Sequence, residues 1–330
     1  MAPRAASTTS RAWSRPERVF PVEPKVIAPP TYGYVTYAIV TRGWLRAPAR
    51  WPPASSRLHH TTGGGTVCSG SGEGGLVGSG LLYRLYERRL ARNLDPGRLP
   101  GHVAVMLDGN RRWARALGEP PAHGHRKGAD NITELLEWSA DVGIQRVTLW
   151  MLSTDNLGRD PEEIAELLEI ICSAVDTLAD DGRWRVHVVG ALELLPPEVS
   201  SCLTSAEARN AARVRHGLDV NVAIGYGGRH EITDAVRALL REMAAKGITI
   251  EQAASILSVD DIADHLYTAG QPDPDLIIRT SGEQRMSGFL LWQSVHSEVY
   301  FCETYWPDFR RVDFLRALRD YGQRERRMGK

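Results

Sequence analysis

The chain has 330 residues, of which 42% are hydrophobic and 24% charged, with 40 Lys and Arg against 40 Asp and Glu. This composition excludes a disordered or fibrous protein and supplies a large buried core for one large domain or two small ones. No segment offers the roughly 18 uninterrupted apolar residues of a membrane-spanning helix, since the best attempt, residues 26–40, is interrupted by Pro29, Pro30 and Gly33.

The first 80 residues differ in composition from the remainder. Residues 1–60 hold nine Lys and Arg with two acidic residues, and residues 61–80 hold nine glycines, which leaves 31 basic and 37 acidic residues in 81–330. We predict that residues 1–80 form a disordered tail rich in Arg, Pro and Gly, because such a sequence cannot offset the entropy of ordering. An alternative expectation is that native translation begins near Val67 or Val77, which mapping of the N-terminal peptide would decide.

From Leu81 onward, helical and extended patterns alternate along the chain. After an amphipathic helix over 81–94, β-branched runs predict strands at 103–107, 147–152, 186–189, 218–224, 276–278 and 299–301. Helical patterns lie between them at 129–143, 160–179, 205–215 and 229–247. Asp160 and Pro161 form a strong start for the second of these. The alternation predicts an α/β fold, a mostly parallel sheet of six strands surrounded by helices.

Unusual polar residues gather where four of the predicted strands end. Asp108 follows the first strand, STDN (153–156) the second, GYGGRH (225–230) the fourth, and RTSGEQR (279–285) the fifth. In open α/β sheets, ligands bind beyond the carboxyl ends of the strands. The mildly acidic body gives no general attraction for anions, so an anion site here must arise from local arrangement.

The segment DGNRRW (108–113) combines an acid with donors for an anion. Gly109 permits a tight turn, and Asn110 to Arg112 would begin a helix whose free N–H groups attract an anion. Arg112 suits phosphate. Because Asp108 would repel a bare phosphate, its position predicts a bridging Mg²⁺. The structural alternative is an Asp-Gly turn with arginines on a solvated face.

Two further segments are candidates for anion binding. HGHRKGA (123–129) places His125 and Arg126 just before a predicted helix, and RTSGEQRMS (279–287) places Arg279, Arg285 and Ser287 in one turn region. Two guanidinium groups and a hydroxyl would suit a diphosphate.

Other features favour structural interpretations. DDIAD (260–264) is better explained by Asp260 capping a helix than by a metal site, because only one such cluster occurs. The cysteines show no C-x-x-C spacing, and we expect buried free thiols in a reducing cytoplasm; they are Cys68, Cys172, Cys202 and Cys302.

The motifs together resemble the cis-prenyltransferases, the undecaprenyl diphosphate synthase family. The resemblance runs from about Leu81 to Lys330 and rests on HVAVMLDGNRRWAR, GHRKGA, TLWMLSTDNLGRDPEEI, NVAIGYGGRHEI, DPDLIIRTSGEQRMSGFLLWQ, SEVYFCETYWPDF and RERRMGK, in that order. It implies that residues 81–330 form a catalytic domain, that the protein is a homodimer, and that a hydrophobic tunnel holds a growing isoprenoid.

The resemblance also assigns roles to residues. Asp108 and Glu298 would bind Mg²⁺, the latter close to the dimer contact, and Arg327 to Gly329 would reach the partner's active site. Catalytic roles would fall to Asp108, Asn156 and His125. The allylic diphosphate and reacting carbons would contact Gly109, Asn110, Arg111, Arg112, Trp113, His125, Ser153, Thr154, Asp155, Asn156 and Arg159. Isopentenyl diphosphate would bind Arg279, Arg285 and Ser287.

Departures from the common family pattern bear on product length. Met151 and Leu157 stand where many long-chain members have a small residue and Trp. A bulky Met151 would act as a floor, and this pattern resembles that of actinobacterial synthases of short Z-isoprenyl diphosphates. We therefore expect a short product of about C15, made from geranyl diphosphate and isopentenyl diphosphate, with farnesyl diphosphate as another allylic substrate to consider. Pro120 and Pro121 occupy a stretch in which family members often have a basic residue. One contact to the diphosphate is therefore left without an assigned residue.

Three alternatives remain at this stage. The first is a long-chain decaprenyl or undecaprenyl diphosphate synthase, and the second is a non-catalytic partner subunit of a cis-prenyltransferase. A nucleic-acid binder acting through the Arg-rich tail is disfavoured by the acidic body and the absence of interleaved basic and aromatic residues. We expect a cytoplasmic enzyme that contacts the inner face of the plasma membrane peripherally to release its product.

Overall fold

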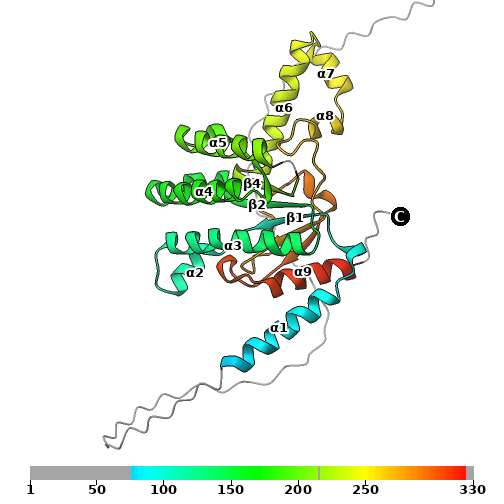
Figure 1. The fold of residues 1–330 in the computed structure, drawn as a ribbon. Coiled ribbons are helices and arrows are strands. Elements are labelled where there is room, and N and C mark those ends of the chain that lie inside the picture. The colour runs from blue at the N-terminus through cyan, green and yellow to red at the C-terminus, as the bar shows by residue number, and fades with distance from the viewer. Residues whose placement is uncertain (1–75, 215, 325–330) are drawn as a thin grey trace, which may run out of the picture. The chain divides into compact units, whose positions relative to one another are not determined.

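A computed structural model describes residues 76–214 and 216–324, which belong to the compact unit Gly70–Lys330 (Figure 1). Residues 1–75, most of the predicted tail, lie outside the described residues, as does the predicted Arg327–Gly329 contact. Helix α1 spans Leu76–Arg92. Residues 76–80, the last of the predicted tail, lie within the bounds of this helix.

The centre of the unit is a six-stranded parallel sheet with the order β3-β4-β2-β1-β5-β6. The strands are β1 (His102–Met106), β2 (Arg146–Ser153), β3 (Trp184–Val189), β4 (Leu218–Tyr226), β5 (Leu276–Arg279) and β6 (Glu298–Phe301). All six predicted strands are present, and the predicted α/β class is confirmed. Strand β4 is buried along its whole length, as expected for a strand covered on both faces.

The helices that follow α1 connect and cover these strands. They are α2 (Asn110–Ala116), α3 (Pro121–Asp141), α4 (Pro161–Asp181), α5 (Pro197–Arg213), α6 (Gly228–Ala245), α7 (Ile250–Ile256), α8 (Val259–Ala263) and α9 (Arg311–Gln323). The Asp160 side chain caps α4 by accepting from the backbone N–H groups of Glu162 and Glu163, which confirms that prediction.

Helices α3 and α5 begin earlier than predicted. Each has proline at its first position, Pro121 and Pro197, where the missing N–H group costs no hydrogen bond. The predicted starts at 129 and 205 were late because the first turns contain few apolar residues. His125 and Arg126 consequently lie inside α3, whereas we predicted them just before a helix.

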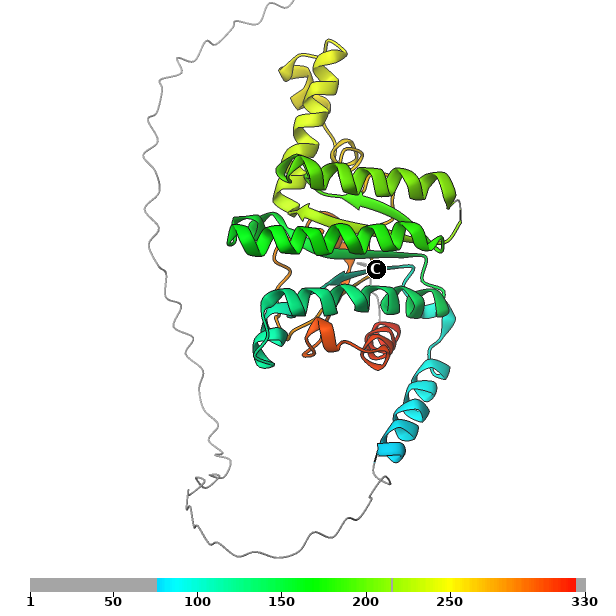
Figure 2. The same cartoon turned by 60° about the vertical axis from the view of Figure 1, so that its left-hand side comes forward.

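Two apolar layers sandwich the sheet. Helices α3, α4 and α5 lie side by side over one face, with α9 next to α3 (Figures 1 and 2). Their core contains alternate strand residues such as Val105, Leu149 and Val222. The opposite face carries a smaller cluster that includes Phe289 and Leu290.

Helices α6 to α8 extend beyond the sheet and form a small apolar cluster of their own around Leu239, Met243 and Ala253 (Figure 1). The DDIAD segment lies here. Ser258 is the N-cap of α8 and Asp260 lies in the first turn, so the structural interpretation holds but Asp260 is not the cap. A serine hydroxyl one position before the first helical residue fills that role better.

None of the helices in the described ranges combines the length and apolar character needed to cross a membrane. Cys172, Cys202 and Cys302 are free thiols, as predicted, but only Cys302 is buried and the other two are half-buried. Cys68 lies outside the described residues.

Candidate active site

A cavity of about 510 Å³ opens at the carboxyl ends of β2, β1 and β5. These strands are neighbours in the sheet, so segments that are far apart in the sequence meet there. Helices α2, α3 and α4 complete the wall. The cavity is lined by Met106, Leu107, Asp108, Gly109, Asn110, Arg111, Arg112, Arg115, His125, Trp150, Met151, Leu152, Ser153, Asp155, Asn156, Arg159, Leu167, Arg279, Arg285 and Ser287.

The lining of this cavity is strongly basic. It includes six arginines and two aspartates, although residues 81–330 as a whole carry more acidic than basic side chains. Guanidinium groups form paired, charge-assisted hydrogen bonds with phosphate oxygens. The local arrangement therefore supplies the attraction for anions that the net charge does not.

The turn after β1 depends on glycine. Gly109 has φ +108° and is the N-cap of α2, and a Cβ atom there would lie 2.7 Å from Cδ1 of Tyr305. Only glycine combines this backbone conformation with such a close neighbour. The turn lets α2 begin at Asn110, as predicted, and brings Arg111 and Arg112 to the cavity directly after Asp108.

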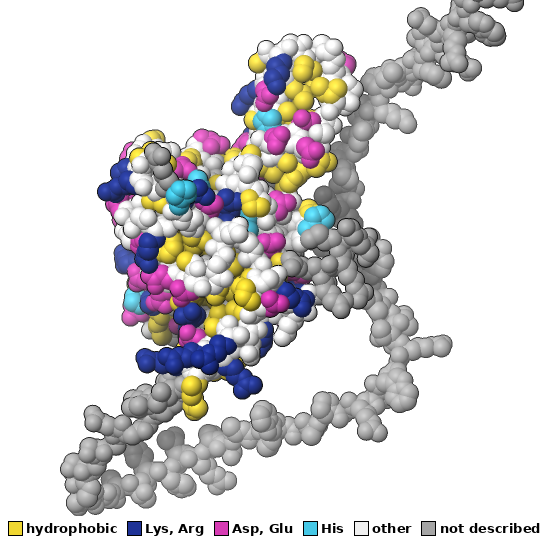
Figure 3. All heavy atoms as spheres, turned by 45° about the vertical axis from the view of Figure 1, so that its right-hand side comes forward, with side chains coloured by type: hydrophobic (Ala, Val, Ile, Leu, Met, Phe, Trp, Pro, Cys, Tyr) yellow, Lys and Arg dark blue, Asp and Glu magenta, His cyan; other side chains and the backbone are white. Residues whose placement is uncertain are grey.

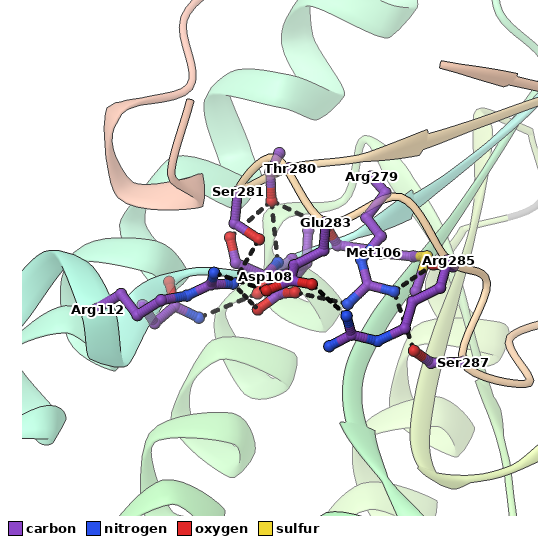
Figure 4. A network of polar contacts seen from close by, with 11 residues as sticks. Met106, Asp108, Arg112, Arg279, Thr280, Ser281, Glu283, Arg285 and Ser287 are labelled. Atoms are coloured by element: carbon purple, nitrogen blue, oxygen red, sulfur yellow. Dashed lines mark hydrogen bonds and ion pairs between the residues drawn. The ribbon is translucent and has the colours of Figure 1, made fainter. Parts of the chain in front are cut away.

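Asp108 lies between two arginines from different parts of the chain (Figure 4). Arg112 Nη2 donates to Asp108 Oδ1 at 3.2 Å, and Arg279 Nη2 donates to Asp108 Oδ2 at 2.8 Å. Arg279 is only 4% exposed, so its charge needs a partner. Burial raises the pKa of the Asp108 carboxyl, but the bonds to Arg279 and the charge of Arg112 outweigh that effect and leave its pKa below the usual value.

The turn after β5 orients the other arginines. Ser281 and Ser287 adopt positive φ values of 78° and 49°, a strained conformation that is common at functional sites. Both hydroxyls accept hydrogen bonds from site arginines: Ser281 from Arg112 at 2.6 Å and Ser287 from Arg279 at 2.9 Å (Figure 4).

Glu283 links the two sides of this network. Its carboxylate accepts a hydrogen bond from Arg112 at 2.9 Å and is paired with Arg285 (Figure 4). Arg112, Arg279 and Arg285 are therefore held in one group by two carboxylates. An anion with several oxygens could take over these donors.

A second group of arginines surrounds Glu163 on α4. Its Oε1 atom lies 3.3 Å from Arg111 Nε and 3.3 Å from Arg159 Nη1. His125 also lines the cavity, and its Nε2 atom is buried without a hydrogen-bond partner. Burial, followed by the charge of Arg159, lowers the pKa of His125 to about 4, so at neutral pH this ring is uncharged and has one nitrogen available to a ligand.

The remaining wall is apolar and comes from β1, β2 and α4. Trp150, Met151, Leu152 and Leu167 contribute side chains to the cavity, and Trp150 is stacked on Phe289 with ring centroids 4.9 Å apart. These apolar side chains border the main hydrophobic core, and the hydrophobic tunnel for a growing isoprenoid stays a prediction.

Besides Glu298, three predicted site residues do not line the cavity. Trp113 is stacked on His123 at 5.6 Å between centroids. Thr154 faces Gly227, since a Cβ on Gly227 would lie 2.4 Å from the Thr154 Oγ1 atom. Leu157 packs against the main core. All three are next to residues that do line the cavity.

The structure does not bring Glu298 to Asp108 within one chain. Glu298 is the first residue of β6, whereas Asp108 follows the carboxyl end of β1, and parallel register puts them at opposite ends of the sheet. Glu298 instead accepts a hydrogen bond from Arg324 at 2.6 Å. The joint role of Asp108 and Glu298 in binding Mg²⁺, which the resemblance implied with Glu298 close to the dimer contact, therefore stays a prediction.

The structure adds residues that sequence analysis missed. Arg115 lines the cavity, and its place three residues after Arg112 on a helix was a signal for it. Trp150 was visible as an aromatic residue near the end of β2. Glu163 and Glu283 were missed, although each has one arginine partner close in sequence, Arg159 and Arg285, besides a distant one.

Comparison with known proteins identifies the family. A family model described as "Putative undecaprenyl diphosphate synthase" matches residues 106–329. The chain belongs to the undecaprenyl diphosphate synthase family. It is accordingly a prenyltransferase, and the resemblance inferred from the motifs is confirmed.

Relatives of this prenyltransferase include enzymes with short products. The chain is 62% identical to a (2Z,6E)-farnesyl diphosphate synthase of Thermobifida fusca, with 75% of this chain and 97% of the relative covered. It is 55% identical to a short-chain Z-isoprenyl diphosphate synthase of Mycobacterium leprae, covering 76% and 96%. A crystal structure of lavandulyl diphosphate synthase from Lavandula x intermedia with dimethylallyl diphosphate matches with a TM-score of 0.65 and 32% identity, over 71% of this chain and all of that one.

Proposed function

We propose that this prenyltransferase condenses isopentenyl diphosphate with a short allylic diphosphate, geranyl or farnesyl diphosphate, to give a Z-isoprenyl diphosphate, with (2Z,6E)-farnesyl diphosphate as the main product. The observation that carries this proposal is one small cavity with two groups of arginines and an apolar wall containing Met151. The names of the bacterial relatives support the short product.

The two arginine groups would bind the two diphosphates. Arg111 and Arg159, with Arg112 and the turn at Gly109, would bind the allylic diphosphate. Arg279, Arg285 and Ser287 would bind the diphosphate of isopentenyl diphosphate. His125 would donate a hydrogen bond from its unpartnered Nε2 atom, with the proton placed on that nitrogen.

The reaction breaks the bond between C1 of the allylic substrate and its diphosphate oxygen. The terminal alkene carbon of isopentenyl diphosphate forms the new bond to C1, a proton leaves its C2, and free diphosphate departs. Arginines fixed before the reaction stabilise the charge that develops on the leaving oxygen. Ser153 and Asn156 would face the reacting carbons, and the apolar wall would keep water from the allylic cation.

The residues around Asp108 fit a magnesium ion. Mg²⁺ prefers oxygen ligands and is usually held by one or two carboxylates together with substrate phosphates. Asp108 is ionised, its side chain is one-third exposed, and the Ser281 hydroxyl and Glu283 carboxylate belong to the same network. When bound, Mg²⁺ would neutralise charge on the departing diphosphate. Asp108 would hold it while Arg112 and Arg279 turn toward the phosphate oxygens.

A product assay tests the proposal. Purified protein with Mg²⁺, isopentenyl diphosphate and, in separate reactions, dimethylallyl, geranyl or farnesyl diphosphate should use geranyl diphosphate well. The C15 product should contain one new Z double bond by NMR. Products of about C50 would support a long-chain synthase, and no turnover with any primer would support a non-catalytic subunit.

We further propose that the enzyme is a homodimer. Strand β6 is an edge strand of the sheet, and Phe301 and Val295 beside it are exposed. The arm formed by α6 to α8 also exposes Ile250 and Val259, and Figure 3 shows apolar side chains on its surface. Exposed edges and apolar patches of this kind are commonly covered by a partner. Light scattering should give a dimer mass, and a monomer would refute this proposal.

The cellular location is a separate proposal. We propose that the enzyme works in the cytoplasm and contacts the inner face of the plasma membrane peripherally when product is released. Cell fractionation should place most of the protein in the soluble fraction, with a membrane-bound part that high salt or mild detergent removes. Recovery outside the cytoplasm would refute it.

A further inference from the structure

A second cluster of polar side chains lies away from the cavity, at the carboxyl ends of β3 and β4. Glu193 belongs to the short 3-10 helix Leu192–Leu194 that follows β3, and His230 and Asp234 are four residues apart on α6. One oxygen of each carboxylate and one nitrogen of the imidazole lie within 4.8 Å of one another. None of these residues lines the cavity of the active site.

The imidazole of His230 points its Nε2 atom at the two carboxylates without forming a hydrogen bond. This nitrogen is buried and forms no hydrogen bond, although the His230 side chain is 32% exposed, and it lies at ion-pair distances of 3.3 Å from Asp234 Oδ2 and 3.9 Å from Glu193 Oε1. A buried polar atom without a hydrogen bond calls for an explanation. An ion between the three groups would satisfy it.

The distances match those between ligands of one metal ion. Two ligand atoms at about 2.0–2.2 Å from a tetrahedral Zn²⁺ lie roughly 3.3 Å apart, and His230 and Asp234 already have this separation. Glu193 is slightly too far, but its side chain is 67% exposed, so a small rotation would bring it into place.

The surroundings of Asp234 also resemble those of a metal ligand. The Tyr267 hydroxyl donates a hydrogen bond of 2.5 Å to Asp234 Oδ2, and such outer contacts orient metal ligands. Arg237 donates to the other oxygen at 2.9 Å. Its positive charge opposes a cation, but Arg237 is more than half exposed, so water and salt screen this repulsion.

We propose that Glu193, His230 and Asp234 bind a divalent transition-metal ion of the Zn²⁺ type. Three protein ligands from nitrogen and oxygen atoms leave a fourth position for water. A ligand set with imidazole favours Zn²⁺ over Mg²⁺, which prefers oxygen alone. The ion would join the segment after β3 to the start of α6 and so stabilise the folded chain.

Zinc titration of the untagged full-length protein, after treatment with a chelator, tests the proposal. Calorimetry should show one Zn²⁺ site per chain in millimolar Mg²⁺, and Zn²⁺ should raise the unfolding temperature. His230→Ala and Asp234→Asn should lose this site. Because Glu193 is exposed, the Glu193→Gln variant should fold normally. Its affinity for Zn²⁺ should nevertheless be lower than that of the native protein.

Matched variants separate this site from other histidines and from the active site. His265→Ala, which removes a histidine paired with Glu242 on the arm, should keep the Zn²⁺ site, and so should Asp108→Asn. Tyr267→Phe should weaken Zn²⁺ binding by about tenfold or more, as expected for loss of an outer contact. Unchanged Zn²⁺ binding in a folded His230→Ala protein, or no site in the native protein, would overturn the proposal.

Discussion

Asp108 is the residue on which the geometry of the active site depends. Its two oxygens receive hydrogen bonds from Arg112 on α2 and Arg279 at the end of β5. Arg279 is buried, and an unpaired buried charge is strongly destabilising. The carboxylate therefore places two arginines for substrate and is itself available for a metal ion.

The two arginine groups should be separable by steady-state kinetics. Arg285→Ala should raise the KM for isopentenyl diphosphate about 10- to 100-fold, the effect of losing a charged hydrogen bond of about 1.5–3 kcal/mol, and should change the KM for geranyl diphosphate much less. Arg159→Ala should instead raise the KM for geranyl diphosphate and change the KM for isopentenyl diphosphate much less. Equal effects of each variant on both KM values would contradict the assignment of one group to each diphosphate.

Met151 should limit product length. Met151→Ala removes a side chain that lines the cavity, so the growing chain gains room and products longer than C15 should appear by reversed-phase chromatography. Leu157→Ala is the matched control, because Leu157 packs against the main core as Met151 does but does not line the cavity, so this variant should lower stability without lengthening products. Products of unchanged length from the Met151→Ala variant would contradict the hypothesis that the Met151 side chain limits chain length.

Sequence patterns identified residues with local signals better than residues that act across the fold. Asp108, Arg279 and Ser287 were predicted because each follows a strand, and all line one cavity. Glu163 and Glu283 were missed, because what places them at the site is the pairing with Arg111 and Arg112, which are distant along the chain. The role of Glu298 came from the family resemblance alone, because a single acidic residue before a strand carries no local signal of its own.

At the scale of elements, the contact between α2 and α3 fixes the turn that carries Asp108. Gly124 of α3 lies so close to α2 that an added Cβ would be 2.1 Å from the backbone oxygen of Asn110. The backbone at Asn110 cannot move aside without shifting the neighbouring residues Gly109 and Asp108, because protein interiors are close-packed.

Gly124→Ala should therefore lower both stability and turnover. We expect a loss of about 1–3 kcal/mol in the free energy of unfolding, typical of overpacking, with a clear fall in kcat. Gly322→Ala in α9 is the matched control, since its Cβ would meet only ordinary contacts and alanine favours helix by up to about 1 kcal/mol. Urea unfolding and kinetics of both variants test this, and a fully active and stable Gly124→Ala protein would contradict it.

The strands were easier to predict than the ends of the helices. Short β-branched runs bounded by polar residues marked all six strands. Helices α3 and α5 begin with proline in polar turns, and α9 was not predicted, although its buried residues Val312, Leu315 and Leu318 recur at helical spacing. Strand order also had no local signal, although it decides that the ends of β2, β1 and β5 meet.

For the whole molecule, the buried His102 and the half-buried His125 tie stability to pH. His102 donates from Nδ1 to the carbonyl of Pro272 and its Nε2 is bonded to Thr148 at 2.8 Å. Burial is the main cause that lowers the pKa of His102 to about 4, from 6.5. The unfolded chain therefore binds a proton between these pH values and the folded chain does not.

The free energy of unfolding should fall as the pH drops from about 6.5 to about 4. A shift of this size corresponds to roughly 3 kcal/mol for His102, and His125 acts in the same direction. His102→Gln should be less stable at pH 7 but should show a weaker dependence on pH in urea unfolding. If the free energy of unfolding of His102→Gln depended on pH as strongly as that of the native protein, groups other than His102 would be responsible for the dependence.

The central claim is that Asp108 organises a cavity in which a diphosphate leaves an allylic carbon. The most direct test is the kcat of Asp108→Ala with geranyl and isopentenyl diphosphates in saturating Mg²⁺, on protein shown by circular dichroism to be folded. The account predicts a fall of about a hundredfold to a thousandfold, as for loss of one fixed electrostatic group. Turnover equal to that of the native enzyme would contradict it.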